Sequence, residues 1–154
     1  MKKAIKIVRP LVLALICVAP QLSFGVRELA DLAALKWALR AGSAERPTMS
    51  AVLIYDSAQL EPSDAKRLLG VFNKAAHNHV YRDYVEFLEL DLKNWSLNDI
   101  EILGKILNLE QFPLVALFDN GKFLELLTGP KLTKFRNLVN FVAQGFKLEI
   151  LALK

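Results

Sequence analysis

Cysteine is the scarcest residue of this 154-residue chain, which contains only Cys17. A single cysteine cannot form an intramolecular disulfide, so the protein must be stabilised by its apolar core alone. One cysteine and two histidines also leave too few ligands for a cysteine–histidine zinc site. No apolar run reaches the roughly 20 residues that a membrane-spanning helix needs. These absences favour one ordinary domain, and the chain is long enough to bury a core.

The first 25 residues have the layout of a secretory signal peptide. A basic start is followed by an apolar run of nine residues, from Leu11 to Ala19, and then by Pro20. Ser23 and Gly25 supply small residues at the positions that a signal peptidase reads. We therefore predict cleavage after Gly25 and export to the bacterial periplasm. The alternative is an uncleaved segment that anchors the protein in the inner membrane.

Removal of residues 1–25 changes the charge balance. Four of the 20 basic residues and none of the 16 acidic ones precede Val26, so 16 of each remain. The basic isoelectric point of the whole chain, about 9.2, then belongs to the signal peptide and does not indicate a nucleic-acid partner. Cys17 is removed as well. It does not follow the small residues of a lipoprotein signal, so we interpret it as a small hydrophobic residue.

Helical and strand patterns alternate along the rest of the chain. Ser96 and Asp99 resemble a capping box, and Asp119-Asn120-Gly121 is typical of a hairpin turn. The patterns predict, in order, helix 26–41, strand 51–55, helix 62–76, strand 84–92, a helix opened by Ser96, strand 114–118, strand 122–127 and a last helix through 132–142.

This order predicts an α/β domain. Strands joined through helices pair in parallel, whereas the hairpin adds antiparallel strands at one side. We expect a mixed four-stranded sheet with helices on both faces, formed by residues 26–145. Residues 146–154 form an apolar C-terminal tail, which we expect to pack on its own domain.

The segment from Gln111 to Lys122 resembles the thioredoxin superfamily. It has Pro113 ahead of a strand, Asn120-Gly121 in a hairpin turn and Gly129 after the returning strand, at the family's spacing. The resemblance covers roughly 51–143, and it implies a thioredoxin-like fold with a cis bond before Pro113.

The same resemblance shows what has been lost. The family's Cys-Gly-Pro-Cys motif corresponds to the degenerate stretch Leu60-Glu61-Pro62-Ser63, and its buried acidic residue corresponds to Ile54. Disulfide exchange needs a thiolate, and the chain has no cysteine after residue 17. We therefore expect no thiol–disulfide oxidoreductase activity, and nothing in the sequence indicates a cofactor.

In thioredoxin-like proteins, the surface beside the cis-proline holds an extended peptide. The resemblance therefore implies a candidate binding surface formed by Gln59, Leu60, Phe112, Pro113 and Gly129. The plainer interpretation, which we favour for Leu60 and Phe112, is that these side chains close the top of the core, because scattered apolar residues on a surface are ordinary.

Two other constellations carry weaker hypotheses. His77 and His79 could ligate a metal, but three or four converging ligands are needed, so we expect no metal site. Ser63 could serve an enzyme with a non-thiol site, yet no nucleophile-elbow glycines surround it. We predict a redox-inactive, exported protein that binds another protein or an extended peptide, as an assembly factor, a chaperone-like protein or an envelope-complex subunit. The alternatives are that non-thiol enzyme and a purely structural domain.

Overall fold

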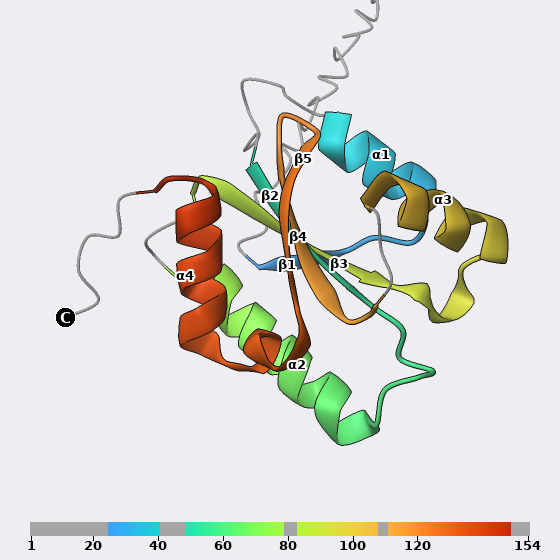
Figure 1. Cartoon of the computed structure of the whole chain (residues 1–154), viewed down its shortest axis with the longest axis horizontal. Helices are drawn as coiled ribbons and strands as arrows, with labels where there is room; N and C mark the ends of the chain where they lie inside the picture. Colours follow the sequence, from blue (N-terminus) through green and yellow to red (C-terminus); the bar gives the residue numbers. More distant parts are fainter. Residues whose placement is uncertain (1–24, 41–48, 79–82, 108–110, 149–154) are drawn as a thin grey trace, which may run out of the picture.

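The computed structural model describes residues 25–40, 49–78, 83–107 and 111–148 (Figure 1). Five strands form one sheet in the order β1-β3-β2-β4-β5. The strands are β1 (Val26–Glu28), β2 (Met49–Tyr55), β3 (Val85–Asp91), β4 (Leu114–Asp119) and β5 (Lys122–Thr128). β1, β3 and β2 run parallel, β4 is antiparallel to β2, and β5 is antiparallel to β4.

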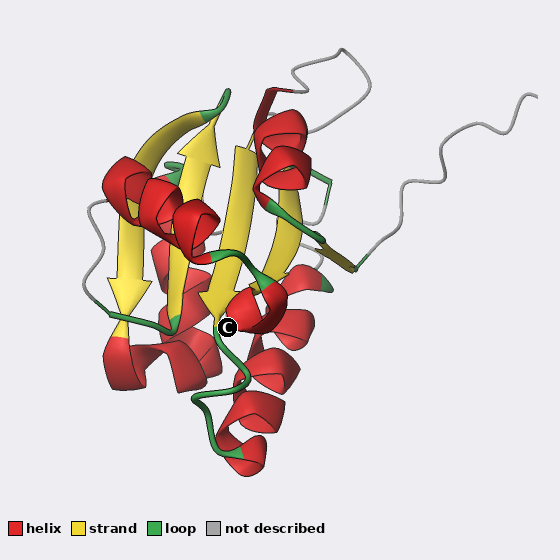
Figure 2. Cartoon of the chain, turned by 90° about the vertical axis from the view of Figure 1, so that its right-hand side faces the viewer, coloured by secondary structure: helices red, strands yellow, loops and turns green. Residues whose placement is uncertain are grey.

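The helices cover both faces of this sheet (Figure 2). One face carries α1 (Leu32–Arg40) and α3 (Leu97–Leu107), and the other carries α2 (Pro62–Ala76) and α4 (Phe135–Gly145). Two short 3₁₀ helices, η1 (Leu92–Asn94) and η2 (Gly129–Thr133), complete the chain order. The layered α/β architecture predicted from the sequence is therefore confirmed.

Alternation along the strands divides the core into two halves. On β2, Leu53 and Tyr55 face α2 and α4, whereas Val52 and Ile54 face α1 and α3. Phe72 of α2 packs edge-on against Phe87 of β3, with ring centroids 5.2 Å apart. All described residues of the two core halves lie between Val26 and Leu148. A chain that starts at Val26 thus keeps the whole described core.

The prediction of four strands is wrong, because the segment 26–41 does not form one continuous helix. Val26–Glu28 instead pairs with β3, and the amide of Leu29 donates to the carbonyl of Glu89 at 2.8 Å. Asp31 then begins the helix by accepting a hydrogen bond from the Ala34 amide at 2.7 Å. Pairing with an open sheet edge outweighed the helical periodicity, which is only a weak preference.

The other turn and cap predictions are confirmed. Ser96 Oγ accepts from the amide of Asp99 at 3.1 Å, at the start of α3. Asn120 and Gly121 both have positive φ, 49° and 74°, as a primed hairpin turn requires. The hairpin also carries a register shift beside Leu117 and Phe118. Beyond α4, Phe146 is buried in the core and Leu148 packs against it, as expected for the tail; residues 149–154 lie outside the described part.

Candidate functional site

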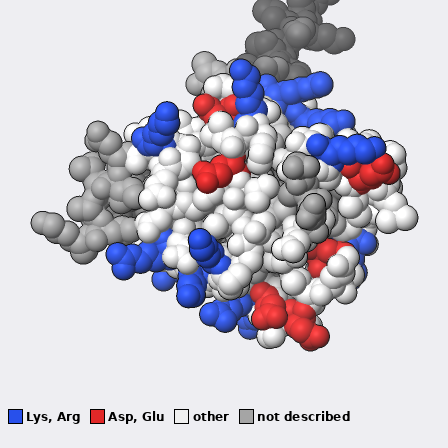
Figure 3. Space-filling view, viewed as in Figure 1, with Lys and Arg blue, Asp and Glu red and all other residues white. Residues whose placement is uncertain are grey.

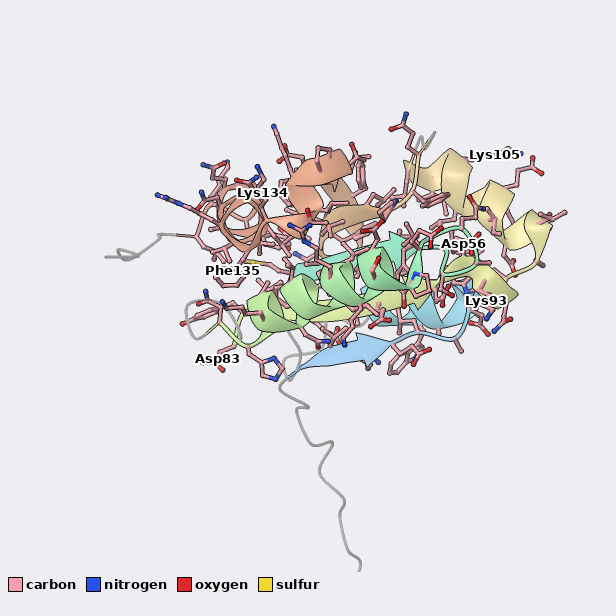
Figure 4. The ribbon with its side chains drawn as sticks, turned by 90° about the horizontal axis from the view of Figure 1, so that it is seen from below. Asp56, Asp83, Lys93, Lys105, Lys134 and Phe135 are labelled. Carbon is pink, nitrogen blue, oxygen red and sulfur yellow. The ribbon has the colours of Figure 1, made fainter. Side chains whose placement is uncertain are left out.

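The predicted binding residues meet at one end of the sheet. β2 ends at Tyr55, β4 begins at Leu114 opposite Ile54, and Leu114 is also opposite Thr128 of β5. The segment before β4, the loop after β2 and Gly129 after β5 are therefore neighbours at this end, which lies on the side of Asp56 in Figure 4.

The Phe112–Pro113 peptide bond is cis, as the family resemblance implies. Phe112 is 37% exposed, Pro113 is half-buried and Gln111 is exposed. On the other side, Gly129 is exposed and has a φ of 73°. The Phe112 ring thus lies partly in solvent, beside the short stretch of backbone that precedes β4.

The loop that follows β2 is held by Asp56. Its carboxylate accepts from the amide of Ala58 at 2.9 Å and from Nε2 of Gln59 at 2.7 Å, and its carbonyl accepts from the Gln59 amide. Gln59 is exposed, whereas Leu60 is partly buried against the core beneath α2 and α4. Leu60 therefore matches the plainer interpretation that it closes the core, and Gln59 and Phe112 remain the accessible members of the set.

The degenerate motif lies at the start of α2. Glu61 is the N-cap, and its carbonyl accepts from the amides of Asp64 and Ala65, while its side chain makes no cap bond. Pro62 is the first helical residue, and Ser63 is exposed in the first turn. Within the described part of the chain, nothing hydrogen-bonds the Ser63 hydroxyl. Among the described residues, no basic side chain therefore lies within hydrogen-bond distance of this serine.

Sequence reasoning missed a second pair of contacts at this end of the sheet. Ser57 donates from its hydroxyl to Asp91 at 2.6 Å and from its amide at 3.0 Å. Further from this end of the sheet, the hydroxyl of Tyr55 in β2 donates a hydrogen bond to the carboxylate of Glu89 in β3 at 2.6 Å. The signal for these contacts was available, because parallel strands that end together bring the residues at their carboxyl ends side by side.

These contacts tune two ionisable groups. Desolvation raises the pKa of Asp91, but hydrogen bonds from the Ser57 hydroxyl and from the amides of Ser57 and Lys93 outweigh it and hold the pKa below its ordinary value. Burial, the bond to Glu89 and the nearby carboxylates raise the pKa of Tyr55. Asp91 is therefore a weaker base than an ordinary carboxylate, and its two bonds from Ser57 hold the loop that follows β2.

The remaining predicted positions are distributed over the fold. Ile54, at the position of the family's buried acid, is fully buried in the core beside α1 and α3. His77 has Nδ1 2.8 Å from the Asn73 carbonyl, and His79 lies outside the described residues. Within the described ranges, no three His, Cys, Asp or Glu side chains group as metal ligands.

The sequence matches no protein-family model and no curated protein. Many solved structures, in contrast, share its architecture. A thioredoxin of Malassezia sympodialis aligns over 79% of this chain and over 91% of its own length, with a TM-score of 0.59 and 16% sequence identity. Thioredoxin f of spinach chloroplasts covers 80% and 95%, with a TM-score of 0.58 and 16% identity. The chain has a thioredoxin-like fold.

Other structural neighbours agree with this assignment. A mutant thioredoxin of Halobacterium salinarum covers 83% of this chain and 95% of its own, with a TM-score of 0.57 and 13% identity. At such identities the likeness concerns the fold alone. Among the described residues of the thioredoxin-like domain, no helix is both long enough and apolar enough to span a bilayer.

Proposed function

We propose that this protein is exported, does not exchange disulfides, and acts by binding another protein or an extended peptide segment. The observation that carries the proposal is the half-exposed Phe112 at the sheet end where redox-active relatives of the fold carry their cysteines. In this chain that place holds Leu60 and Ser63.

Loss of redox chemistry follows from the chemistry of sulfur. A thiolate must attack a disulfide sulfur for exchange to occur, and Cys17 is the only thiol in the sequence. When the leader is removed after Gly25, no thiol remains. The described fold is consistent with that cleavage site, since β1 begins at Val26.

Binding at this surface combines apolar contact with backbone pairing. Part of the Phe112 ring is open to contact. Among the described residues, the backbone amide and the backbone carbonyl of Phe112 form no hydrogen bond with the backbone of a loop or turn. Gln59 and Gly129 flank it as exposed residues with polar groups. An extended segment could pair with the backbone before Pro113 while an apolar side chain packs on Phe112. We propose the periplasm as the location, with an uncleaved inner-membrane anchor as the alternative.

A pair of matched variants tests the surface. Phe112 and Phe123 are nearly equally exposed, 37% and 38%, but Phe123 lies on the edge strand β5 beside the hairpin turn. A partner captured from the envelope is purified, and its affinity is measured for the chain from Val26 and for Phe112→Ala and Phe123→Ala.

We expect Phe112→Ala to weaken binding by about 1–2 kcal/mol, which is roughly a five- to thirtyfold loss, and Phe123→Ala to bind normally. Equal losses in both variants, or no loss in either, would refute the proposed surface. Titration of thiols in the periplasmic protein checks the redox part, since one free thiol per chain would show that Cys17 is retained.

A further inference from the structure

Four basic side chains lie on α2, η2 and the start of α4, three elements that contact one another. Lys74, Lys131, Lys134 and Arg136 are all exposed. The Lys74 ammonium lies 4.6 Å from the ring centroid of Phe135, which joins α2 to the start of α4. The Lys134 amide donates to the carbonyl of Lys131, which joins that start to η2. We call these four residues the basic face.

The charge of the basic face is not neutralised by neighbouring carboxylates. Residues 129–148 contain four lysines or arginines and no aspartate or glutamate, although the chain from Val26 is balanced overall. Arg27 and Lys105 have carboxylate partners in Glu86 and Glu101. Within the described residues, none of the four basic-face side chains has such a partner. Figure 3 shows the resulting cluster of blue side chains at the lower left, over the region of α4 and α2.

The arrangement suits an extended anionic surface. The apolar side of α4 is buried, with Leu138, Val139 and Val142 in the core, so this helix presents its polar side outward. The four cations are spread over two helices and a turn, and Figure 4 shows Lys134 and Phe135 at the opposite end from Asp56 and Lys93. Phe135, whose ring lies beneath the Lys74 ammonium, is partly buried and packs against the core, which holds this part of the basic face in place.

We propose that the basic face binds the surface of a bilayer that contains anionic phospholipid. Each Lys or Arg near such a surface contributes roughly a fivefold gain in partitioning, and the gain is screened by salt. Four residues together give roughly a several-hundredfold preference over a neutral bilayer. This inference uses the proposed export, which brings the chain to the cell envelope, and it does not use the Phe112 surface.

Two triple variants with the same change in net charge provide the test. Lys131→Gln/Lys134→Gln/Arg136→Gln removes three charges from the basic face. Lys36→Gln/Lys93→Gln/Lys122→Gln removes three charges from exposed positions elsewhere. The chain from Val26, which keeps the whole described core, is sedimented with vesicles of phosphatidylglycerol and phosphatidylcholine, or of phosphatidylcholine alone. Circular dichroism confirms folding of each variant.

We expect partitioning to the anionic vesicles to fall roughly a hundredfold in the basic-face variant and to fall steeply as salt rises from about 50 to 500 mM. The control variant should lose much less, and Phe112→Ala should bind vesicles normally. Equal losses in the two triple variants would show that only net charge matters and would overturn the proposal. Tighter binding to polyglutamate than to the vesicles would also overturn it, in favour of an acidic protein partner.

Discussion

The carboxylate of Asp91 is the most informative group to perturb, because it joins the ends of the two central parallel strands. It accepts three hydrogen bonds, from the Ser57 hydroxyl at 2.6 Å and from the amides of Ser57 and Lys93 at 3.0 Å each. In Asp91→Asn, the amide oxygen can still accept from the two backbone amides. The charged acceptor for the Ser57 hydroxyl is lost.

The expected magnitude follows from these contacts. A hydrogen bond to a charged group contributes about 1.5–3 kcal/mol, and partial exposure of Asp91 screens part of that gain. We therefore expect Asp91→Asn to lower the free energy of unfolding by about 1–2 kcal/mol at neutral pH. In a domain of this size, that corresponds to a fall in Tm of roughly 3–6 °C.

The pH dependence gives the sharper test. Because the folded pKa of Asp91 is lowered, its contribution is fully present above the unfolded value of about 3.9 and is lost as the pH falls through the folded pKa. Urea unfolding at pH 7 and at about pH 3 should show the gap between wild type and Asp91→Asn closing in acid. Ser57→Ala removes the hydrogen bond that contributes most to the lowered pKa of Asp91 but leaves the two amide bonds, so it should lose part of the acid sensitivity and keep the rest. A gap that is absent at pH 7, or that has the same size at both pH values, would refute this account.

Three further substitutions test the fold by urea unfolding. Gly121→Ala places a Cβ 2.7 Å from the carbonyl oxygen of Leu39 at a φ of 74°, so we expect it to lower the free energy of unfolding by about 2 kcal/mol or more. Gly70→Ala, in open space within α2, should instead raise the free energy of unfolding by about 0.5–1 kcal/mol. A loss of stability in both variants would contradict the backbone argument. Ile54→Asp places an unpaired carboxylate at a fully buried position and should cost about 3–5 kcal/mol of stability. Ile54→Val should cost about 1 kcal/mol. Similar costs for the two variants would show that the site is solvated. Phe146→Ala should cost about 2–4 kcal/mol because this residue, only 8% exposed, is buried in the core half that α2 and α4 cover. A cost below about 0.5 kcal/mol would show that the tail is not part of the core.

Much of the fold was predictable because its elements carry strong local signals. Pro62 opens α2, Ser96 caps α3, and Asn120-Gly121 forms the hairpin turn, each as its residue type favours. β1 was not predictable in this way. Its three residues have no strand pattern of their own, and only β3, about 60 residues later, gives their backbone a partner.

The candidate site divides in the same way. The cis bond before Pro113 and the placement of Gly129 followed from a motif within one hairpin. The contact between Ser57 and Asp91 joins the loop after β2 to the last residue of β3, so it follows from the parallel pairing of two distant strands and not from a local pattern. The inward position of Leu60 agrees with the plainer interpretation, whereas the partial exposure of Phe112 depends on tertiary packing that residue type alone does not determine.

The position of β1 at the start of the described chain would make the sheet sensitive to where the proposed leader is cut. With cleavage after Gly25, as proposed, Val26–Glu28 covers one edge of β3. A cut only three residues later would remove that cover and leave the backbone edge of β3 at Phe87, Leu88 and Glu89 open to other strands. Uncovered apolar edges are templates for aggregation. We therefore expect a chain that lacks Val26–Glu28 to self-associate through the uncovered edge of β3.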